Sequence, residues 1–346
     1  MSIQQFIQLM PKVELHVHLE GSIRPATLLA LAERNEVSLP AESVEEVEAW
    51  YTFTDFAHFV QIYFAICDCL RTAEDFELIT REFLIGQEAQ NIRHSEVIFT
   101  PYTHHAHVPM DEQLAAINAA RAWAEEELEV TMLLIPDISR DIRPIEHSLE
   151  VARWAIANQN NGICGLGLGG PEIGNPPELF REAFALAQEA GLPALPHAGE
   201  TVGPASMRGA LDALHARRIG HGVRCLEDAE LVAELRERQI PLEVCPSSNV
   251  CLGVTPSLEE HPLPRLLEEG LYVTVNSDDP PMFNTTLTEE YERIQDAFGF
   301  DIKQLKRLVF NGLQASLLPE TQRRRLAQEF VVEFAELDHR LGPSHV

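Results

Sequence analysis

Lysine is nearly absent from this 346-residue sequence, and acidic residues far outnumber basic ones. Lysine occurs only at Lys12, Lys303 and Lys306, so none lies between positions 13 and 302. The 54 Asp and Glu residues, against 26 Lys and Arg, give a formal charge of −28. Such a surface repels phosphate backbones and anionic lipids, so we expect neither a nucleic-acid polymer nor a membrane as a partner.

Long hydrophobic runs and paired cysteines are also missing. No stretch of 18 or more apolar residues occurs, which argues against a membrane-spanning helix. The N-terminus has no basic segment followed by an apolar one, so we expect no signal peptide. The absence of a CxxC pair predicts reduced, largely buried thiols in a cytoplasmic protein. The six cysteines are Cys67, Cys69, Cys164, Cys225, Cys245 and Cys251.

The chain contains no linker of Gly and Ser, no low-complexity segment and no clear internal repeat. Hydrophobic residues make up 45% of the sequence, which is enough for a large core. Barrels often use this length as one unit, so we expect a single domain over 1–346. The sequence leaves the oligomeric state open.

Eight short β-like runs alternate with helical patterns such as 176–191 and 206–218. This alternation predicts a parallel sheet, and eight strands close into a (β/α)8 TIM barrel of the α/β class. An open doubly wound sheet would show a Gly-rich loop after its first strand, whereas here that strand ends in His-x-His. The expected strands are 13–19, 92–99, 130–135, 162–169, 192–199, 217–222, 240–245 and 271–277.

Two further segments are expected to be helical. Residues 40–91 are too many for one strand–helix connection, and their apolar spacing predicts two or more helices. We expect this helical insertion after strand 1 to be able to cover the mouth of the barrel. The tail beyond residue 285 is also expected to form helices, which pack on the outside.

His16 and His18 alternate on the first strand, so both imidazoles point to the same face. In a barrel, residues near the carboxyl end of a strand line the mouth. Two imidazoles on one face form half of a tetrahedral site, and zinc suits such ligands. The motif alone is weak, since ordinary histidines also occur near strand ends.

Other His and Asp residues end further predicted strands. His197 ends the fifth strand, His221 the sixth, and Asp278 and Asp279 the eighth. Buried polar groups of this kind are costly unless they are paired or bind a metal. Together they predict a catalytic zinc, which would lower the pKa of its bound water and yield hydroxide near neutral pH. The expected ligands are His16, His18, His197 and Asp278.

Glu200 follows His197 by three residues, in the loop beyond the strand. There a carboxyl group can reach a substrate without binding the metal, which suits a proton donor. Many two-metal barrel hydrolases bridge their ions with a modified lysine on a middle strand. The lysine-free middle of this chain therefore favours one zinc per chain, although a bridging carboxylate stays open.

Four motifs in this order resemble the adenosine deaminase family of the amidohydrolase superfamily. They are KVELHVHLEGS (12–22), HAGE (197–200), IGHG (219–222) and NSDDP (276–280). The resemblance runs from about residue 9 to about residue 320. It implies the same four zinc ligands and the hydrolytic deamination of a 6-aminopurine nucleoside, such as adenosine to inosine plus ammonia.

The resemblance also implies roles for the residues around the metal. Glu200 would protonate the ring nitrogen beside the amino-bearing carbon, and His221 would orient the attacking hydroxide. Asp279 would hydrogen-bond the imidazole part of the purine. Gly170 would donate its N–H to another ring nitrogen. Glu20, which follows the His-x-His motif, would lie near the sugar, and His18 would also contact the substrate.

One segment departs from the common pattern of the family. Typical members have an Asp three residues before the glycine that matches Gly170, whereas Gly167 stands here and Pro171 follows. The stretch 165–177 looks like a bacterial adenosine deaminase-like branch. Some members of that branch act on aminodeoxyfutalosine, a nucleoside of menaquinone biosynthesis that carries adenine. Free adenine is less expected, because adenine deaminases of the superfamily usually have a Ser-rich segment there.

Two other classes of function stay open. A zinc-dependent hydrolase of a cyclic amide or phosphoester would use the same metal, but the missing middle-strand lysine weighs against it. A catalytically silent nucleoside-binding protein would have lost a ligand or the acid, and none is missing here. The sequence assigns no role to Ser247–Asn249 or to the His-rich segment 103–107, which lacks a nearby carboxylate or cysteine.

Overall fold

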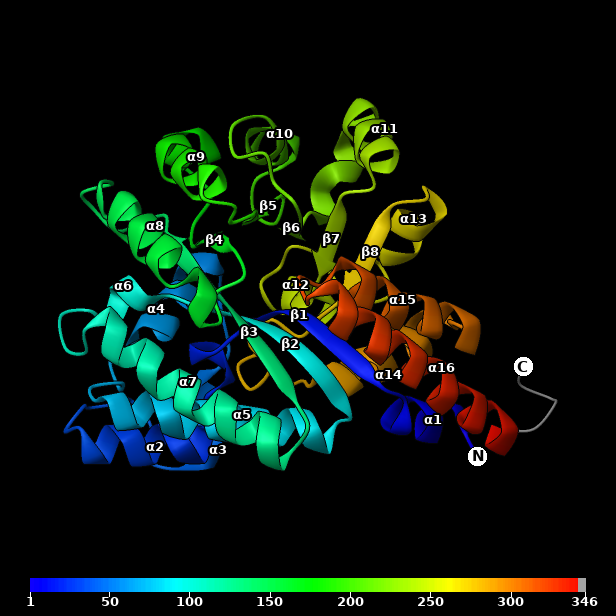
Figure 1. Cartoon of the computed structure of the whole chain (residues 1–346), viewed down its shortest axis with the longest axis horizontal. Coiled ribbons are helices and arrows are strands. Elements are labelled where there is room, and N and C mark those ends of the chain that lie inside the picture. Colours follow the sequence, from blue (N-terminus) through cyan, green and yellow to red (C-terminus); the bar gives the residue numbers. More distant parts are fainter. Residues whose placement is uncertain (342–346) are drawn as a thin grey trace.

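The computed structural model describes residues 1–341, in which eight parallel strands follow one another around a barrel (Figure 1). Neighbouring strands pair in sequence order from β1 to β8. The strands are β1 (Lys12–His18), β2 (Ile92–Phe99), β3 (Thr131–Ser139), β4 (Leu166–Gly169), β5 (Ala194–Ala198), β6 (Ile219–His221), β7 (Pro241–Val244) and β8 (Tyr272–Val275).

The ring is closed where β1 meets the segment that follows β8. Val17 forms a parallel bridge with Asp278. The backbone N–H of His18 donates to Asp278 O at 2.8 Å, and that of Asp278 donates to His16 O at 3.1 Å. The expected (β/α)8 barrel is therefore confirmed, and its closure brings the first and last motifs together.

The boundaries of β3 and β4 differ most from the expected ones. The run 130–135 ends early, because β3 continues through Asp137 and Ser139, which pair with β4. These polar side chains line the mouth, so hydrophobicity alone does not report this end of the strand. β4 begins only at Leu166, and before it Ile163 forms a single bridge with Leu134.

Helices surround the barrel and fill the long connection after β1 (Figure 1). The helices up to β5 are α1 (Ile3–Leu9), α2 (Pro25–Arg34), α3 (Val44–Trp50), α4 (Phe56–Cys67), α5 (Ala73–Ala89), α6 (Pro101–His104), α7 (Met110–Glu127), α8 (His147–Ala157) and α9 (Arg181–Glu189). Those after β5 are α10 (Pro204–Asp212), α11 (Ala229–Arg238), α12 (Pro246–Cys251), α13 (Leu263–Glu268), α14 (Leu287–Phe298), α15 (Ile302–Ala315) and α16 (Glu320–Leu341).

The helical connection between β1 and β2 reaches the mouth through α4. Asp55 caps this helix by accepting from His58 N, and Ile62 and Ile66 are buried against the core. Phe56 and Tyr63, from the same helix, line the pocket at the carboxyl ends of the strands. A helix that is mostly apolar on both sides is stable here because one side packs on the core and the other covers the pocket.

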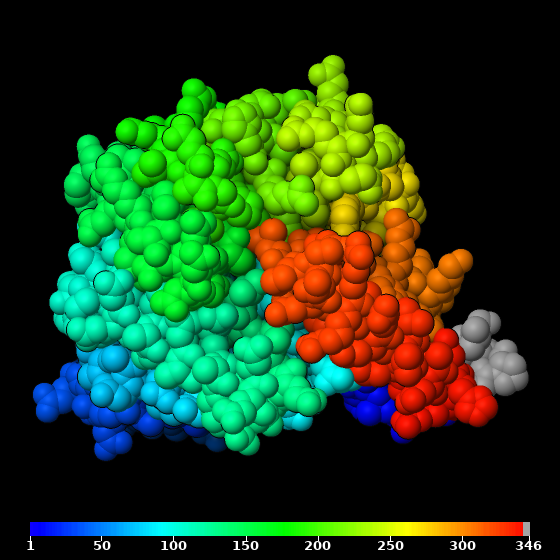
Figure 2. Space-filling view, viewed as in Figure 1, coloured from blue at the N-terminus to red at the C-terminus, as the bar shows by residue number. Residues whose placement is uncertain are grey.

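The C-terminal helices α14–α16 pack outside the barrel, as the sequence predicted (Figure 1). Helix α15 buries Leu305, Leu308 and Val309, and α16 stacks Phe334 on Phe6 of α1 with ring centroids 6.0 Å apart. In Figure 2 the orange and red surface of these helices forms a ridge across one face. Over residues 1–341, no helix is long and apolar enough to span a membrane.

Candidate active site

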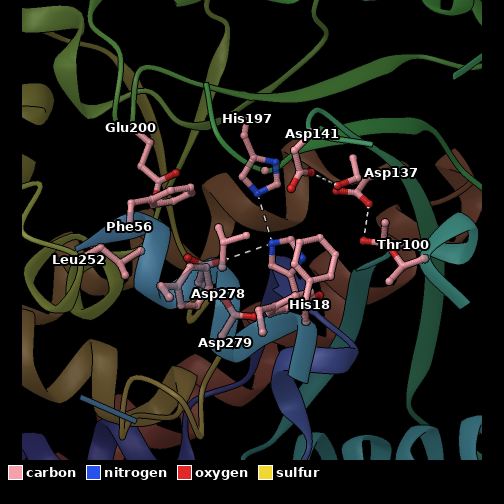
Figure 3. Close-up of a pocket in the computed structure, with 18 of the residues that line it drawn as sticks. His18, Phe56, Thr100, Asp137, Asp141, His197, Glu200, Leu252, Asp278 and Asp279 are labelled. Atoms are coloured by element: carbon pink, nitrogen blue, oxygen red, sulfur yellow. Dashed lines mark hydrogen bonds and ion pairs between the residues drawn. The ribbon is translucent and has the colours of Figure 1, made fainter. Parts of the chain in front are cut away.

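The site lies at the carboxyl ends of the strands, where a pocket encloses about 630 Å³ of space that partly opens to solvent (Figure 3). Residues from β1, β3, β5, β6 and the segment after β8 line it, together with α4. In a (β/α)8 barrel this end holds the active site, because all eight strand-to-helix loops meet there.

The four predicted ligands converge. His18 Nε2 lies 3.2 Å from His197 Nε2 and 3.3 Å from Asp278 Oδ1, and Figure 3 draws both contacts. His16 Nε2 lies 3.5 Å from the same Asp278 oxygen. All four side chains are buried, so only close charge partners or a metal can compensate for the lost hydration.

The outer ring nitrogens show which atoms are free to bind a metal. His16 Nδ1 donates to Glu243 Oε2 at 2.9 Å, and His197 Nδ1 donates to Leu168 O at 3.0 Å. Each bond leaves a lone pair on Nε2 that points to the centre. His16 Nε2 is buried and has no hydrogen-bond partner there, which fits a nitrogen directed at a cation.

The charges of the cluster favour a cation as well. Burial opposes a proton on His16, but Asp278 and Glu243 raise its pKa to about 9. Burial likewise opposes charge on His18, and Asp279 and Asp278 raise its pKa to about 10. Carboxylates that draw protons onto imidazoles this strongly also attract a metal ion, which would replace those protons. The residues therefore fit a tetrahedral site of the zinc type.

Two strand-end residues adopt unusual backbone conformations. His221 has φ of 60° and Asp278 has φ of 66°, a region that residues other than glycine seldom occupy. Such strain persists only where the surroundings fix it, and it is common at functional sites. Gly220 leaves room beside them, since a Cβ there would lie 2.6 Å from His16 Cε1.

Glu200 is held in place through its backbone by Glu172. The Glu172 carboxylate accepts from the N–H groups of Gly199, Glu200, Thr201 and Val202 at 2.7–3.1 Å. Glu172 is buried between the end of β4 and this loop, which follows β5. Glu172 was not predicted from the sequence, although it lies in the segment around Gly170.

The Glu200 carboxyl group favours its protonated form. Burial, followed by the charges of Asp278 and Glu172, raises the pKa of Glu200 well above its usual value. Its Oε1 lies 3.8 Å from His221 Nε2. A carboxyl group whose pKa is raised, beside a cluster of candidate metal ligands, can act as a general acid.

Asp279 has a buried oxygen without a partner. Its Oδ1 makes no hydrogen bond, and burial together with the charge of Asp278 raises its pKa well above the usual range. Asp279 lines the pocket, and a protonated carboxyl group there can donate to a nitrogen acceptor. Gly21 permits this position, because a Cβ there would overlap the Asp279 carboxyl group.

The opposite wall of the pocket carries residues that sequence analysis did not single out. Thr100 Oγ1 donates to Asp137 Oδ1 at 2.7 Å, and Ser139 Oγ donates to Asp141 Oδ1 at 2.7 Å. Burial raises the pKa of Asp137 to about 6. A Cβ on Gly167 would lie 2.8 Å from Asp137 Cβ, so the departure from the family pattern leaves room for an acid on β3.

Of the residues predicted to bind substrate, three line the pocket and one does not. His18, Gly170 and Asp279 line it. Glu20 is buried behind the wall, where its Oε1 accepts from Thr100 N at 2.9 Å and from His104 Nε2 at 3.1 Å. Its contact with a sugar stays a prediction.

The residues of the His-rich segment 103–107, which had no assigned role, lie in different surroundings. Thr103 lines the pocket, but His104 pairs with Glu20 and His107 contacts Arg71. Within the described residues, the groups of His, Cys, Asp and Glu that could hold a metal all belong to the cluster around Asp278. That cluster also includes His221, which was not predicted as a ligand.

Comparison with known proteins identifies the family. The sequence profile described as adenosine deaminase matches residues 11–332. The chain belongs to the adenosine deaminase family. An aminodeoxyfutalosine deaminase of Streptomyces coelicolor is 40% identical over 331 residues, which cover 94% of this chain and 85% of that protein.

Two solved structures of relatives agree with this assignment. An adenine deaminase of Arthrobacter aurescens superposes with a TM-score of 0.90 at 37% identity, covering 94% of this chain and 99% of that one. A zinc-bound amidohydrolase of Burkholderia ambifaria gives 0.89 at 29% identity, with 96% and 93% covered. The protein is therefore a deaminase, a hydrolase that acts on carbon–nitrogen bonds in cyclic amidines.

Proposed function

We propose that this enzyme removes the amino group of a 6-aminopurine nucleoside by hydrolysis, with one zinc ion held by His16, His18, His197 and Asp278. The observation that carries the proposal is the convergence of these ligand atoms beside the buried Glu200, whose pKa is raised well above its usual value. The zinc-bound relative supports the choice of metal. Zinc would supply a Lewis acid that makes a water nucleophilic near neutral pH.

The chain's own residues supply positioning and proton transfer. Glu200 donates a proton to the ring nitrogen next to the amino-bearing carbon, which makes that carbon more electrophilic. His221 orients the attacking water toward the carbon. Asp279 donates to a nitrogen of the imidazole ring, and the N–H of Gly170 donates to a further ring nitrogen. The amino group then leaves as ammonia, and the ring becomes a 6-oxo purine.

The pocket favours a substrate without a phosphate group. Five carboxyl groups line it, and within residues 1–341 no Lys or Arg side chain does. Apart from the proposed zinc ion, a phosphate would find no cationic side chain to pair with, and the ionised carboxyl groups would repel it in a partly desolvated pocket. The carboxyl groups belong to Asp137, Asp141, Glu200, Asp278 and Asp279.

Free adenine is a second candidate substrate. The burial of Glu20 behind Thr100 and His104 favours it, since this acid was the expected contact for a sugar. The Arthrobacter aurescens relative is an adenine deaminase. The Streptomyces coelicolor relative supports aminodeoxyfutalosine as the nucleoside in the same way. Both candidates use the same chemistry on the purine ring.

A panel of substrates tests the proposal. Ammonia release would be measured from adenosine, 2′-deoxyadenosine, aminodeoxyfutalosine, adenine, N6-methyladenine and AMP, with the zinc content determined in parallel. We expect turnover of at least one neutral 6-aminopurine, little turnover of AMP, and one zinc per chain. Hydrolysis of a cyclic amide or phosphoester without ammonia release, or tight purine binding without turnover, would refute it.

A further inference from the structure

Asn249, in the segment after β7 that had no assigned role, lies directly behind His221. It belongs to α12 and is fully buried. Its backbone is fixed on both sides: its N–H donates to Cys245 O at 3.0 Å, and its carbonyl accepts from Thr255 N at 3.0 Å. Its side-chain amide lies between two histidine rings, those of His221 and His261.

A backbone N–H sets the direction of the hydrogen bonds that link His261, Asn249 and His221. Leu263, the first residue of α13, donates its N–H to His261 Nδ1 at 3.1 Å. A backbone amide can only donate, so Nδ1 accepts and the proton of the ring lies on Nε2. Burial lowers the pKa of His261 to about 4, which keeps the ring neutral.

The same order of donor and acceptor continues from His261 through Asn249 to His221. His261 Nε2 donates to Asn249 Oδ1 at 3.0 Å, so that end of the amide is the oxygen. The other end, Nδ2, lies 3.3 Å from His221 Nδ1 and donates to it. A histidine whose Nδ1 accepts a hydrogen bond carries its proton on Nε2.

The resulting N–H of His221 points into the site. Its Nε2 lies 3.8 Å from Glu200 Oε1 and 3.9 Å from Asp278 Oδ2, and both distances exceed a hydrogen bond. The N–H therefore faces the space between the acid and the metal-binding cluster. A protonated Nε2 has no lone pair for a metal, which separates His221 from the other three histidines of the cluster.

We propose that Asn249 and His261 are positioning residues that hold His221 as the Nε2–H tautomer. In this form His221 donates a hydrogen bond to the attacking water and cannot accept a proton from it. After Glu200 has given its proton to the ring nitrogen, its carboxylate takes a proton from the attacking water and passes it to the amino group that leaves as ammonia. The proposal rests on the proposed function for its catalytic consequence, whereas the tautomer itself can be measured without turnover.

The tautomer is read by NMR on the zinc-loaded protein with 15N-labelled histidine rings. Long-range 1H–15N correlations distinguish a protonated ring nitrogen from a bare one, and a His221→Asn variant assigns the signal. We expect His221 to have a proton on Nε2 and a bare Nδ1. A proton on Nδ1, or a metal-bound Nε2, would overturn the proposal even if the enzyme is an active deaminase.

Three variants test the consequence for catalysis on whichever aminopurine is turned over. Asn249→Asp keeps the shape of the side chain but cannot donate, so His221 should move its proton to Nδ1. We expect kcat to fall by about 10²-fold, as for the loss of one positioned hydrogen-bond donor, with KM changed by less than about threefold. His261→Leu removes the donor that orients the Asn249 amide, and we expect the same change of tautomer with a smaller loss of about tenfold.

His261→Gln supplies an amide N–H in place of the imidazole N–H, and we expect it to recover most of the activity lost in His261→Leu. The exposed residue His339, on α16, provides the control His339→Leu, which should behave as wild type. An Asn249→Asp enzyme that keeps kcat within twofold contradicts the proposal. If that variant does not fold, as judged by circular dichroism, the His261 pair decides: equal loss in Leu and Gln also overturns it.

Discussion

The two walls of the pocket are built differently (Figure 3). On one side, beside Asp279, the residues Glu200, His221 and Asp278 are directed by buried contacts from neighbouring strands and loops. On the other, the acidic and hydroxyl groups of β3 and Thr100 pair mainly with one another. We call these the reaction wall and the substrate wall. The first matches the chemistry of the family, whereas the second contains the departure at Gly167.

The largest effect is expected on the reaction wall. Glu200→Gln keeps the volume of the side chain but removes the transferable proton. We expect kcat to fall by about 10³-fold, within the range of general acid catalysis, with KM little changed. Steady-state ammonia release checks this, and correct folding and zinc content serve as controls. A loss below tenfold would place the proton donor elsewhere.

A smaller loss is expected from the residue that holds the Glu200 loop. Glu172→Gln places an amide N–H where backbone N–H groups now donate, so the loop must shift. Because small displacements of a catalytic group are costly, we expect kcat to fall by about 10²-fold. The matched variant Glu172→Asp keeps a carboxylate that can accept these bonds, so it should recover part of the lost activity. Unchanged kcat in Glu172→Gln would show that Glu200 does not depend on this contact.

On the substrate wall the effect should appear in KM. A Cβ on Gly169 would overlap Asp137 Oδ2, so Gly169→Ala displaces that carboxyl group. We expect KM to rise about tenfold, equivalent to about 1.4 kcal/mol, while kcat stays within about threefold. The same kinetic assay on Glu200→Gln provides the contrast. A fall in kcat instead of a rise in KM would remove the distinction between the walls.

The smallest expected effect is a dependence of KM on pH. Burial raises the pKa of Asp137 to about 6, so this carboxyl group is ionised above pH 6 and neutral below it. An ionised Asp137 accepts hydrogen bonds from substrate N–H or O–H groups, so KM should rise as the pH falls through 6. Asp137→Asn should lose this rise. KM values from pH 5 to 8 test it, and identical profiles would exclude Asp137 from binding.

The convergence of the four proposed ligands could be predicted because they lie at the carboxyl ends of β1 and β5 and just after β8, and barrel closure places those ends together. Glu172 and Asn249 could not, since their importance comes from contacts with loops of other strands. The sequence shows each only as a polar residue near a strand end. Asp137 was not predicted for another reason. β3 continues past its apolar run, and its carboxyl end lines the pocket instead of the core.

The departure at Gly167 illustrates the same limit. The sequence shows that a side chain is missing from β4, but only the packing shows that Asp137 of the neighbouring strand occupies the space. The sequence alone therefore indicates that an acidic side chain is lost from β4, whereas the structure shows that Asp137 of β3 places an acidic side chain in the same space. The choice among aminopurines is expected to depend on this wall.

The central claim is that one zinc at His16, His18, His197 and Asp278 supports deamination of a 6-aminopurine. The most direct test adds zinc in steps to metal-free protein and follows ammonia release from the best substrate of the panel. We predict activity that rises linearly to one equivalent per chain and then levels off. Ammonia release that is equally fast without zinc, or that needs two equivalents, would contradict the account.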